Sequence, residues 1–245
     1  DEVTACNVAR LVNDSIANAV RTYPDKFIGI GSVPLQHVSK AVLELEYIVK
    51  ELGFHAVQIG SNIEGKQLDA PELVPFFTKA EELGVLVIAH PYYVGAKGSL
   101  EKYYLTNLVG NPLDTALAIT HLIFGGVLDK FPGLKFCFAH GGGYFPYQIG
   151  RLEHGHTVRN EPKTNSVKSP RSYLKQLYFD SILFDQESLK YLMKFAGCDH
   201  VMMGTDYPFD MGEVNPVDFV ESSTEDPEVR KAVLGENAAM ILELI

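Results

Sequence analysis

The chain has 245 residues and a net charge of −10, from 21 Lys and Arg against 31 Asp and Glu. This length suits one large domain or two small ones. Without a cluster of basic residues, neither nucleic acid nor an anionic membrane surface is an expected partner. No apolar run approaches the roughly 18 residues of a membrane span. No basic segment followed by an apolar one opens the sequence, so we expect no secretory leader.

The cysteines indicate the compartment and limit the kind of metal site. Cys6, Cys137 and Cys198 are scattered, with no C-x-x-C spacing. An odd and sparse count argues against a disulfide framework and predicts a cytoplasmic protein. A metal ion bound by this chain would therefore be held by histidine and carboxylate side chains.

Short apolar runs alternate along the chain with amphipathic stretches. The runs are rich in Val, Ile and Phe and are bounded by Gly, Pro or Asp, which predicts strands buried in a parallel sheet. The predicted strands are residues 27–31, 56–59, 85–89, 135–139, 177–179 and 201–204. The predicted helices are residues 1–20, 39–52, 70–83, 115–128 and 186–197, with two or three short helices after residue 216.

Strand followed by helix, six times over, is the pattern of an α/β fold with right-handed crossovers. Two architectures fit: an open doubly wound sheet, and a (β/α)8 TIM barrel from which two βα units are missing. The dinucleotide-binding open sheet needs a G-x-G-x-x-G turn, which this sequence lacks. No linker divides the chain, so we expect residues 1–245 to form one domain, with 159–170 as a long surface loop.

A barrel places its catalytic residues at the carboxyl ends of different strands, and three of the apolar runs end accordingly. His90, His140 and Asp206 each follow such a run and are each followed by Gly or Pro within two residues. Two imidazoles and a carboxylate at one barrel mouth can bind a divalent metal and activate water. The alternative is three separate structural residues, for example a helix N-cap at Asp206. Because the three residues occupy equivalent positions at the ends of separate strands, we favour a shared metal site over three separate structural residues.

The motifs around these residues resemble those of a known family. The segments His90-Pro91, Ala139-His-Gly-Gly-Gly143 and Gly204-Thr-Asp-Tyr-Pro-Phe209 resemble the amidohydrolase-related metal-dependent decarboxylases. The resemblance runs collinearly through nearly the whole chain, from Phe27-Ile-Gly-Ile-Gly31 to Gly150-Arg151. It implies a TIM barrel of the amidohydrolase type.

The resemblance also implies roles for single residues. His90 and Asp206 match metal ligands of the family, whose usual metal is zinc, although another divalent ion would suit the same donors. His140 matches a histidine that acts as acid and base beside the metal, a task for which imidazole is suited near neutral pH. Arg151 matches an arginine that binds a substrate carboxylate in the neighbouring subunit, which implies a homodimer.

Tyr92 and Phe209 are the aromatic side chains that we expect to contact a planar substrate. The family has Trp after His-Pro, whereas this chain has Tyr92 at that position. The family also begins with a strand that carries two metal-binding histidines as H-x-H. The H-x-H of this chain, His154 and His156, lies on a predicted helix, where such positions do not share a face, and we expect both side chains to be exposed. We therefore expect two βα units to lie outside residues 1–245.

Three functions follow from these observations. The first is a zinc-dependent decarboxylase acting on a small unsaturated or aromatic carboxylate. The second is a hydrolase, lactonase or hydratase with the same metal, which motifs for a metal and a base do not distinguish from the first. The third is a non-catalytic barrel that serves as a scaffold.

Three further residues have mainly structural interpretations. We expect His121 to be a hydrogen-bonded core or interface histidine, and Cys137 to pack within its strand. Asp180 also ends an apolar run, so a place at the barrel mouth is the alternative to a purely structural role for this side chain.

Overall fold

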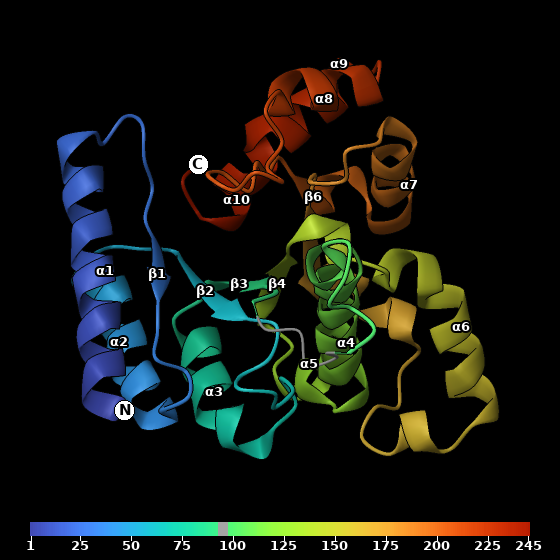
Figure 1. Cartoon of the computed structure of the whole chain (residues 1–245), viewed down its shortest axis with the longest axis horizontal. Helices are drawn as coiled ribbons and strands as arrows, with labels where there is room; N and C mark the ends of the chain where they lie inside the picture. Colours follow the sequence, from blue (N-terminus) through green and yellow to red (C-terminus); the bar gives the residue numbers. More distant parts are fainter. Residues whose placement is uncertain (93–97) are drawn as a thin grey trace.

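A computed structural model describes residues 1–92 and 98–245 of the chain. It contains a single sheet of six parallel strands whose spatial order follows the chain order (Figure 1). The strands are β1 (Ile30–Ser32), β2 (Ala56–Gly60), β3 (Leu86–His90), β4 (Lys135–Phe138), β5 (Leu177–Asp180) and β6 (Val201–Met202). All six predicted strands are confirmed. The first one covers only the end of its predicted run, because Phe27 and Ile28 are exposed residues that precede the pairing with β2.

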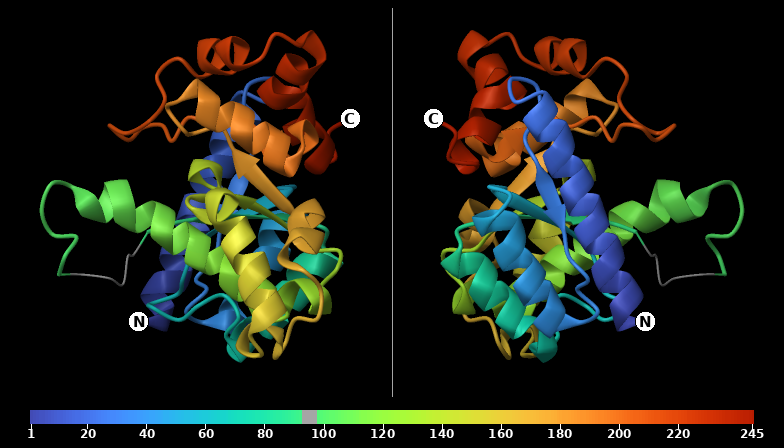
Figure 2. Two further views of the ribbon diagram at one scale, coloured as in Figure 1. Left: turned by 90° about the vertical axis from the view of Figure 1, so that its right-hand side faces the viewer. Right: turned by 90° about the vertical axis from the view of Figure 1, so that its left-hand side faces the viewer.

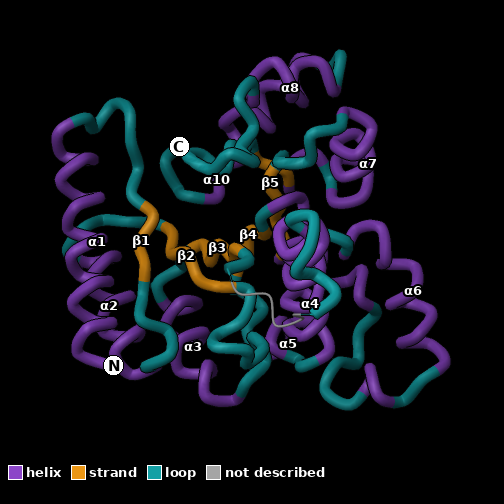
Figure 3. The backbone as a smooth tube through the Cα atoms, in the orientation of Figure 1, coloured by secondary structure: helices purple, strands orange, loops and turns teal. Residues whose placement is uncertain are grey.

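Helices lie between consecutive strands and at both ends of the element order (Figures 2 and 3). The longer helices are α1 (Glu2–Thr22), α2 (Val38–Lys50), α3 (Val74–Glu82), α4 (Asn111–Phe124), α6 (Phe145–Val158), α7 (Gln186–Ala196) and α8 (Pro216–Ser223). The shorter helices are α5 (Val127–Lys130), α9 (Pro227–Lys231) and α10 (Asn237–Ile241). Helices α1 to α9 contribute to the core on one face of the sheet, whereas α10 packs against the other face. None of the helices in the described residues combines the length and the apolarity that a membrane crossing requires.

Local signals explain where several helices begin. The side chain of Asp1 accepts a hydrogen bond from the Thr4 amide at the start of α1, and Asp185 accepts one from the Ser188 amide at the start of α7. Each carboxylate satisfies a backbone N–H that has no partner within its helix. The predicted helix 115–128 is wrong at both ends: α4 starts at Asn111, and Gly126, at φ +76°, separates it from α5.

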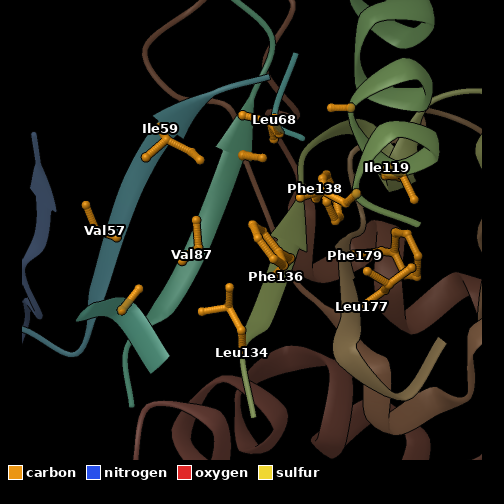
Figure 4. Packing of buried hydrophobic residues seen from close by; sticks show 14 of the residues in the cluster. Val57, Ile59, Leu68, Val87, Ile119, Leu134, Phe136, Phe138, Leu177 and Phe179 are labelled. Carbon is orange, nitrogen blue, oxygen red and sulfur yellow. The ribbon is translucent and has the colours of Figure 1, made fainter. Parts of the chain in front are cut away.

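The main hydrophobic core lies between the sheet and the helices that cover it (Figure 4). Alternate residues of each strand point towards these helices, as the period of two of a strand requires. Phe136 and Phe77 illustrate the packing, because both are fully buried and their ring centroids lie 5.9 Å apart at 70°. The core residues labelled in Figure 4 are Val57, Ile59, Leu68, Val87, Ile119, Leu134, Phe136, Phe138, Leu177 and Phe179.

The other face of the sheet carries a smaller hydrophobic cluster. Leu86, Cys137 and Met202 belong to it, and Ile241 of α10 packs against them. The expectation that Cys137 is a packing residue is confirmed, and burial raises the pKa of its thiol. Because side chains alternate along a strand, the face that begins with Leu86 on β3 ends with His90 at the carboxyl edge.

The sheet is open in the described part of the chain. β1 pairs only with β2, and β6 pairs only with β5. The six parallel strands and their alternation with helices confirm the predicted α/β class. The carboxyl ends of all six strands lie at one edge, and this edge holds the candidate site.

Candidate metal centre

Three polar side chains meet at the carboxyl edge of the sheet. His90 is the last residue of β3, His140 follows β4, and Asp206 lies in the loop after β6. The Nε2 atoms of His90 and His140 each lie 3.4 Å from a different carboxylate oxygen of Asp206. Each residue offers one ligand atom within 4.8 Å of the other two. The structure therefore brings together the three residues that the strand ends indicated.

The backbone at two of these positions adopts an uncommon conformation. His140 has φ +56° and Asp206 has φ +55°, both in the left-handed region that non-glycine residues seldom occupy. Such conformations cost of order 1–3 kcal/mol and occur most often at functional sites. Both residues lie in loops, His140 two residues after the end of β4 and Asp206 four residues after the end of β6, and their side chains meet at the edge of the sheet.

The donor set and its spacing fit a divalent cation. Two imidazole nitrogens and a carboxylate are common ligands of zinc and of other first-row metals. Tetrahedral bonds of 2.0–2.1 Å place neighbouring ligand atoms about 3.4 Å apart, which is the separation between each imidazole and the carboxylate. His90 Nε2 is also buried without a hydrogen-bond partner among the described residues. A buried nitrogen of this kind is costly unless a ligand satisfies it.

Asp180 lies at the end of β5 but points its carboxylate towards the loop that carries His140. It accepts hydrogen bonds from the backbone amides of His140, at 3.0 Å, and Gly141, at 2.9 Å. Burial raises the pKa of Asp180, while the nearby His140 and the backbone amides act in the opposite direction. Asp180 does not belong to the cluster of metal-binding groups that His90, His140 and Asp206 form.

Two cavities adjoin the three residues. The larger, of about 870 Å³, is lined by His90 and Tyr92 together with residues of β1, β2 and α1. The smaller, of about 280 Å³, is lined by His140 and Asp206. Both lie within or close to the range of small-molecule sites. The cluster is therefore open to a small substrate on two sides.

The sequence did not predict the walls of the smaller cavity. They come from the π-helical turn Thr106–Gly110, the first turn of α4 and the loops after β4, β5 and β6. No pattern of spacing in the sequence marks these positions, because only the folded loops bring them beside His140. The wall residues include Asn107, Asn111, Tyr144, Phe184 and Met211.

The predicted substrate-binding residues lie further from the cluster. Tyr92 lines the larger cavity and is 91% exposed, whereas Phe209 is 64% exposed and does not line either cavity. Arg151 lies on the exposed face of α6, also away from both cavities. Tyr93, which follows Tyr92 in the sequence, lies outside the described residues.

Other histidines take structural positions. His121 Nδ1 lies 3.0 Å from a carboxylate oxygen of Asp69, so the expectation of a hydrogen-bonded histidine is confirmed. His154 is exposed as predicted. The prediction for His156 is wrong, because its ring stacks on Phe124 and its Nε2 lies 3.2 Å from the Ser166 carbonyl oxygen. The fold of the segment after α6 covers His156, which helix periodicity alone does not reveal.

The chain is similar to known proteins along nearly its full length. A family model described as Amidohydrolase matches residues 1–244. The chain is 44% identical over 243 residues to 2-amino-3-carboxymuconate-6-semialdehyde decarboxylase of Dictyostelium discoideum, with 98% of this chain and 67% of that protein covered. The protein of the same name from Caenorhabditis elegans is 31% identical over 291 residues, covering 97% of this chain and 72% of that protein.

A solved structure extends the similarity to the fold. The 5-carboxyvanillate decarboxylase of Novosphingobium aromaticivorans, in complex with manganese and 4-hydroxy-3-methoxy-5-nitrobenzoic acid, superimposes with a TM-score of 0.92 at 26% identity. The match covers 99% of this chain and 72% of that chain. The resemblance indicated by the motifs is therefore confirmed.

Proposed function

Because the chain belongs to the amidohydrolase family, we propose that it is a metal-dependent decarboxylase that releases CO2 from a small unsaturated or aromatic carboxylate. The observation that carries this proposal is the convergence of His90, His140 and Asp206 within 4.8 Å at the ends of three strands. The first substrate to test is 2-amino-3-carboxymuconate 6-semialdehyde, since the Dictyostelium relative is named as its decarboxylase. The acidic net charge of the chain does not prevent binding of an anionic substrate, because a metal ion and an arginine would make the potential at the site positive.

We assign separate roles to the three residues. His90 Nε2 and the Asp206 carboxylate hold the metal, for which zinc is our proposed ion. When bound, a divalent ion acts as a Lewis acid that stabilises negative charge on the substrate. His140 stands beside it as acid and base, with its Nε2 towards Asp206 and its side chain in the wall of the smaller cavity.

The proposed reaction needs one proton donor. The bond between the substrate carbon and its carboxylate breaks, CO2 leaves, and the electron pair remains on the carbon. The Nε2–H of protonated His140 then donates its proton to this carbon, and solvent protonates the imidazole again. An imidazole suits this exchange because its ordinary pKa lies near neutrality.

Arg151 would bind a carboxylate of the substrate in the site of a second copy of the chain. Its exposure on α6 and its distance from the cavities of its own chain support this assignment. The proposed active form is therefore a homodimer. Tyr92, on the rim of the larger cavity, would stack on a planar substrate, and Phe209 would contact it from the loop after Asp206.

The test combines product analysis with metal content. The zinc-loaded protein should release CO2, and His140→Gln should lower kcat roughly 10²- to 10⁴-fold while it retains the metal. His154→Gln, at an exposed position on α6, is the matched control and should leave kcat unchanged. Incorporation of water without release of CO2 would instead indicate a hydrolase, lactonase or hydratase. Absence of both activities and of bound metal would indicate a scaffold.

A further inference from the structure

We propose that Asp180 is a positioning residue that holds the His140 imidazole in place for proton transfer. This inference rests on the proposed function, because it assigns a task to a side chain that acts through His140. The supporting observation is a set of hydrogen bonds between the Asp180 carboxylate and the backbone of the loop after β4. Asp180 itself is assigned no contact with the metal or the substrate.

Both oxygens of Asp180 are engaged by backbone amides. Oδ2 accepts from the His140 amide at 3.0 Å, whereas Oδ1 accepts from the Gly141 amide at 2.9 Å and the Ile182 amide at 3.1 Å. A carboxylate that accepts from amides forms stronger hydrogen bonds than a neutral acceptor does. Asp180 thus joins the end of β4 to the end of β5 by bonds to the backbone of the residue whose side chain donates the proton.

The loop after β4 needs such support because its backbone is left-handed. His140 has φ +56° and Gly141 has φ +58°, so neither residue belongs to a regular helix or strand. For His140 this conformation is disfavoured, and the surrounding structure must stabilise it. Two amides that bond to one carboxylate provide that stabilisation and fix the direction in which the imidazole leaves the backbone.

Asp180 also lies next to the loop that carries Asp206. A Cβ atom at Gly204 would come 3.0 Å from the Asp180 Cβ, so the two backbones pack closely there. The residue after Asp180 completes the arrangement, because the Ser181 hydroxyl accepts a hydrogen bond from the Gly204 amide at 3.2 Å. The end of β5 thus supports both neighbours: Asp180 holds the loop of the proton donor, and Ser181 holds the loop of the carboxylate ligand.

Asp180→Asn tests the proposal with little change in shape. The asparagine Oδ1 can still accept from the Gly141 and Ile182 amides. The side-chain NH2 group replaces Oδ2 and faces the His140 amide, and since both groups are donors, the hydrogen bond to His140 is lost. We expect kcat to fall roughly 10- to 100-fold, since small displacements of a catalytic group have effects of this size, with KM within about twofold and an unchanged metal content. Asp185→Asn removes a carboxylate that also accepts from a backbone amide, at the start of α7, and should leave kcat unchanged.

A double-mutant cycle separates positioning from general support of the fold. In a His140→Gln background, Asp180→Asn should lower the residual rate no further, because residues that act as a unit are not additive. An equal loss of rate in both backgrounds, or a loss of bound metal in Asp180→Asn, would overturn the proposal.

The proposal stays testable if the wild-type protein releases no CO2, an outcome that would overturn the proposed function alone. Hydrogen exchange followed by NMR would then report on the loop without any substrate. Faster exchange of the His140 amide in Asp180→Asn, with unchanged exchange in α7, supports the positioning role. Unchanged exchange at both places refutes it.

Discussion

Replacing Asn13 with alanine should destabilise the protein because one buried amide connects α1, β1 and α2. Asn13 is fully buried. Its Oδ1 accepts from the Ser32 amide at 2.8 Å, and its Nδ2 donates to the Ser32 carbonyl at 2.9 Å and to the Glu44 carboxylate at 2.8 Å. The side chain thus satisfies both backbone groups of the last residue of β1, which is an edge strand in the described sheet.

The size of the effect follows from the groups that lose a partner. Asn13→Ala leaves the N–H and the C=O of Ser32 unpaired, and each unsatisfied buried group costs about 1–3 kcal/mol. Ser32 is only partly buried, which favours the lower part of this range. Glu44 keeps its ion pair with Arg10 at 2.7 Å and adds little. We expect a loss of about 2–4 kcal/mol in the free energy of unfolding, or about 4–16 °C in Tm for a chain of this length.

Urea unfolding followed by circular dichroism measures this loss, with Asn18→Ala as the matched control. Asn18 lies on the exposed face of the same helix, so its replacement should change stability by no more than about 0.5 kcal/mol. An Asn13→Ala protein within about 0.5 kcal/mol of the wild type would refute the reasoning, because water would then satisfy the Ser32 backbone as well as Asn13 does.

Three further predictions concern the metal, the substrate and acid stability. Dialysis against a chelator should abolish CO2 release and lower Tm, and zinc or manganese should restore both; activity that survives complete metal removal, measured by mass spectrometry, would contradict the metal role. Arg151→Ala should raise KM at least about tenfold without loss of stability. Dimers formed from one Arg151→Ala chain and one His140→Gln chain should regain part of the activity, and a mixture that shows no gain would exclude action across subunits. Hydrogen bonding from the Ser169 hydroxyl lowers the pKa of Glu153 from its ordinary 4.5, so this carboxylate stabilises the fold fully above pH 4.5 and loses that effect as pH falls through the lowered pKa. Glu153→Gln should therefore destabilise the protein at pH 7 and make little difference in strong acid, and equal destabilisation at both pH values in thermal melts would show that charge is not the cause.

The strands and the three clustered residues could be predicted because each depends on local patterns. A buried parallel strand is an apolar run, and a polar residue at its end, followed by Gly or Pro, has left the core for the edge of the sheet. His90 illustrates the rule most directly, as the last residue of β3. Asp206 satisfies it less closely, because β6 ends at Met202 and the chain needs a left-handed turn at Asp206 to reach the site.

The supporting residues were harder to predict because their partners are backbone atoms of distant loops. Asp180 binds amides 39 and 40 residues earlier in the chain, and nothing in the local sequence shows that these amides face β5. Asn111 enters the wall of the smaller cavity because α4 starts four residues before the predicted position. The task proposed for Arg151 requires a second copy of the chain, so neither the sequence nor one folded chain determines it.

The most direct test of the central claim is to follow the carboxyl carbon and the incoming proton in one reaction. The zinc-loaded protein would be incubated in deuterated water with the proposed substrate, labelled with ¹³C in its carboxyl group. The account predicts one ¹³CO2 for each substrate consumed and one deuterium on the carbon that lost the carboxylate, with both products formed roughly 10²- to 10⁴-fold more slowly by His140→Gln. Substrate consumption with the label retained in the product would contradict it.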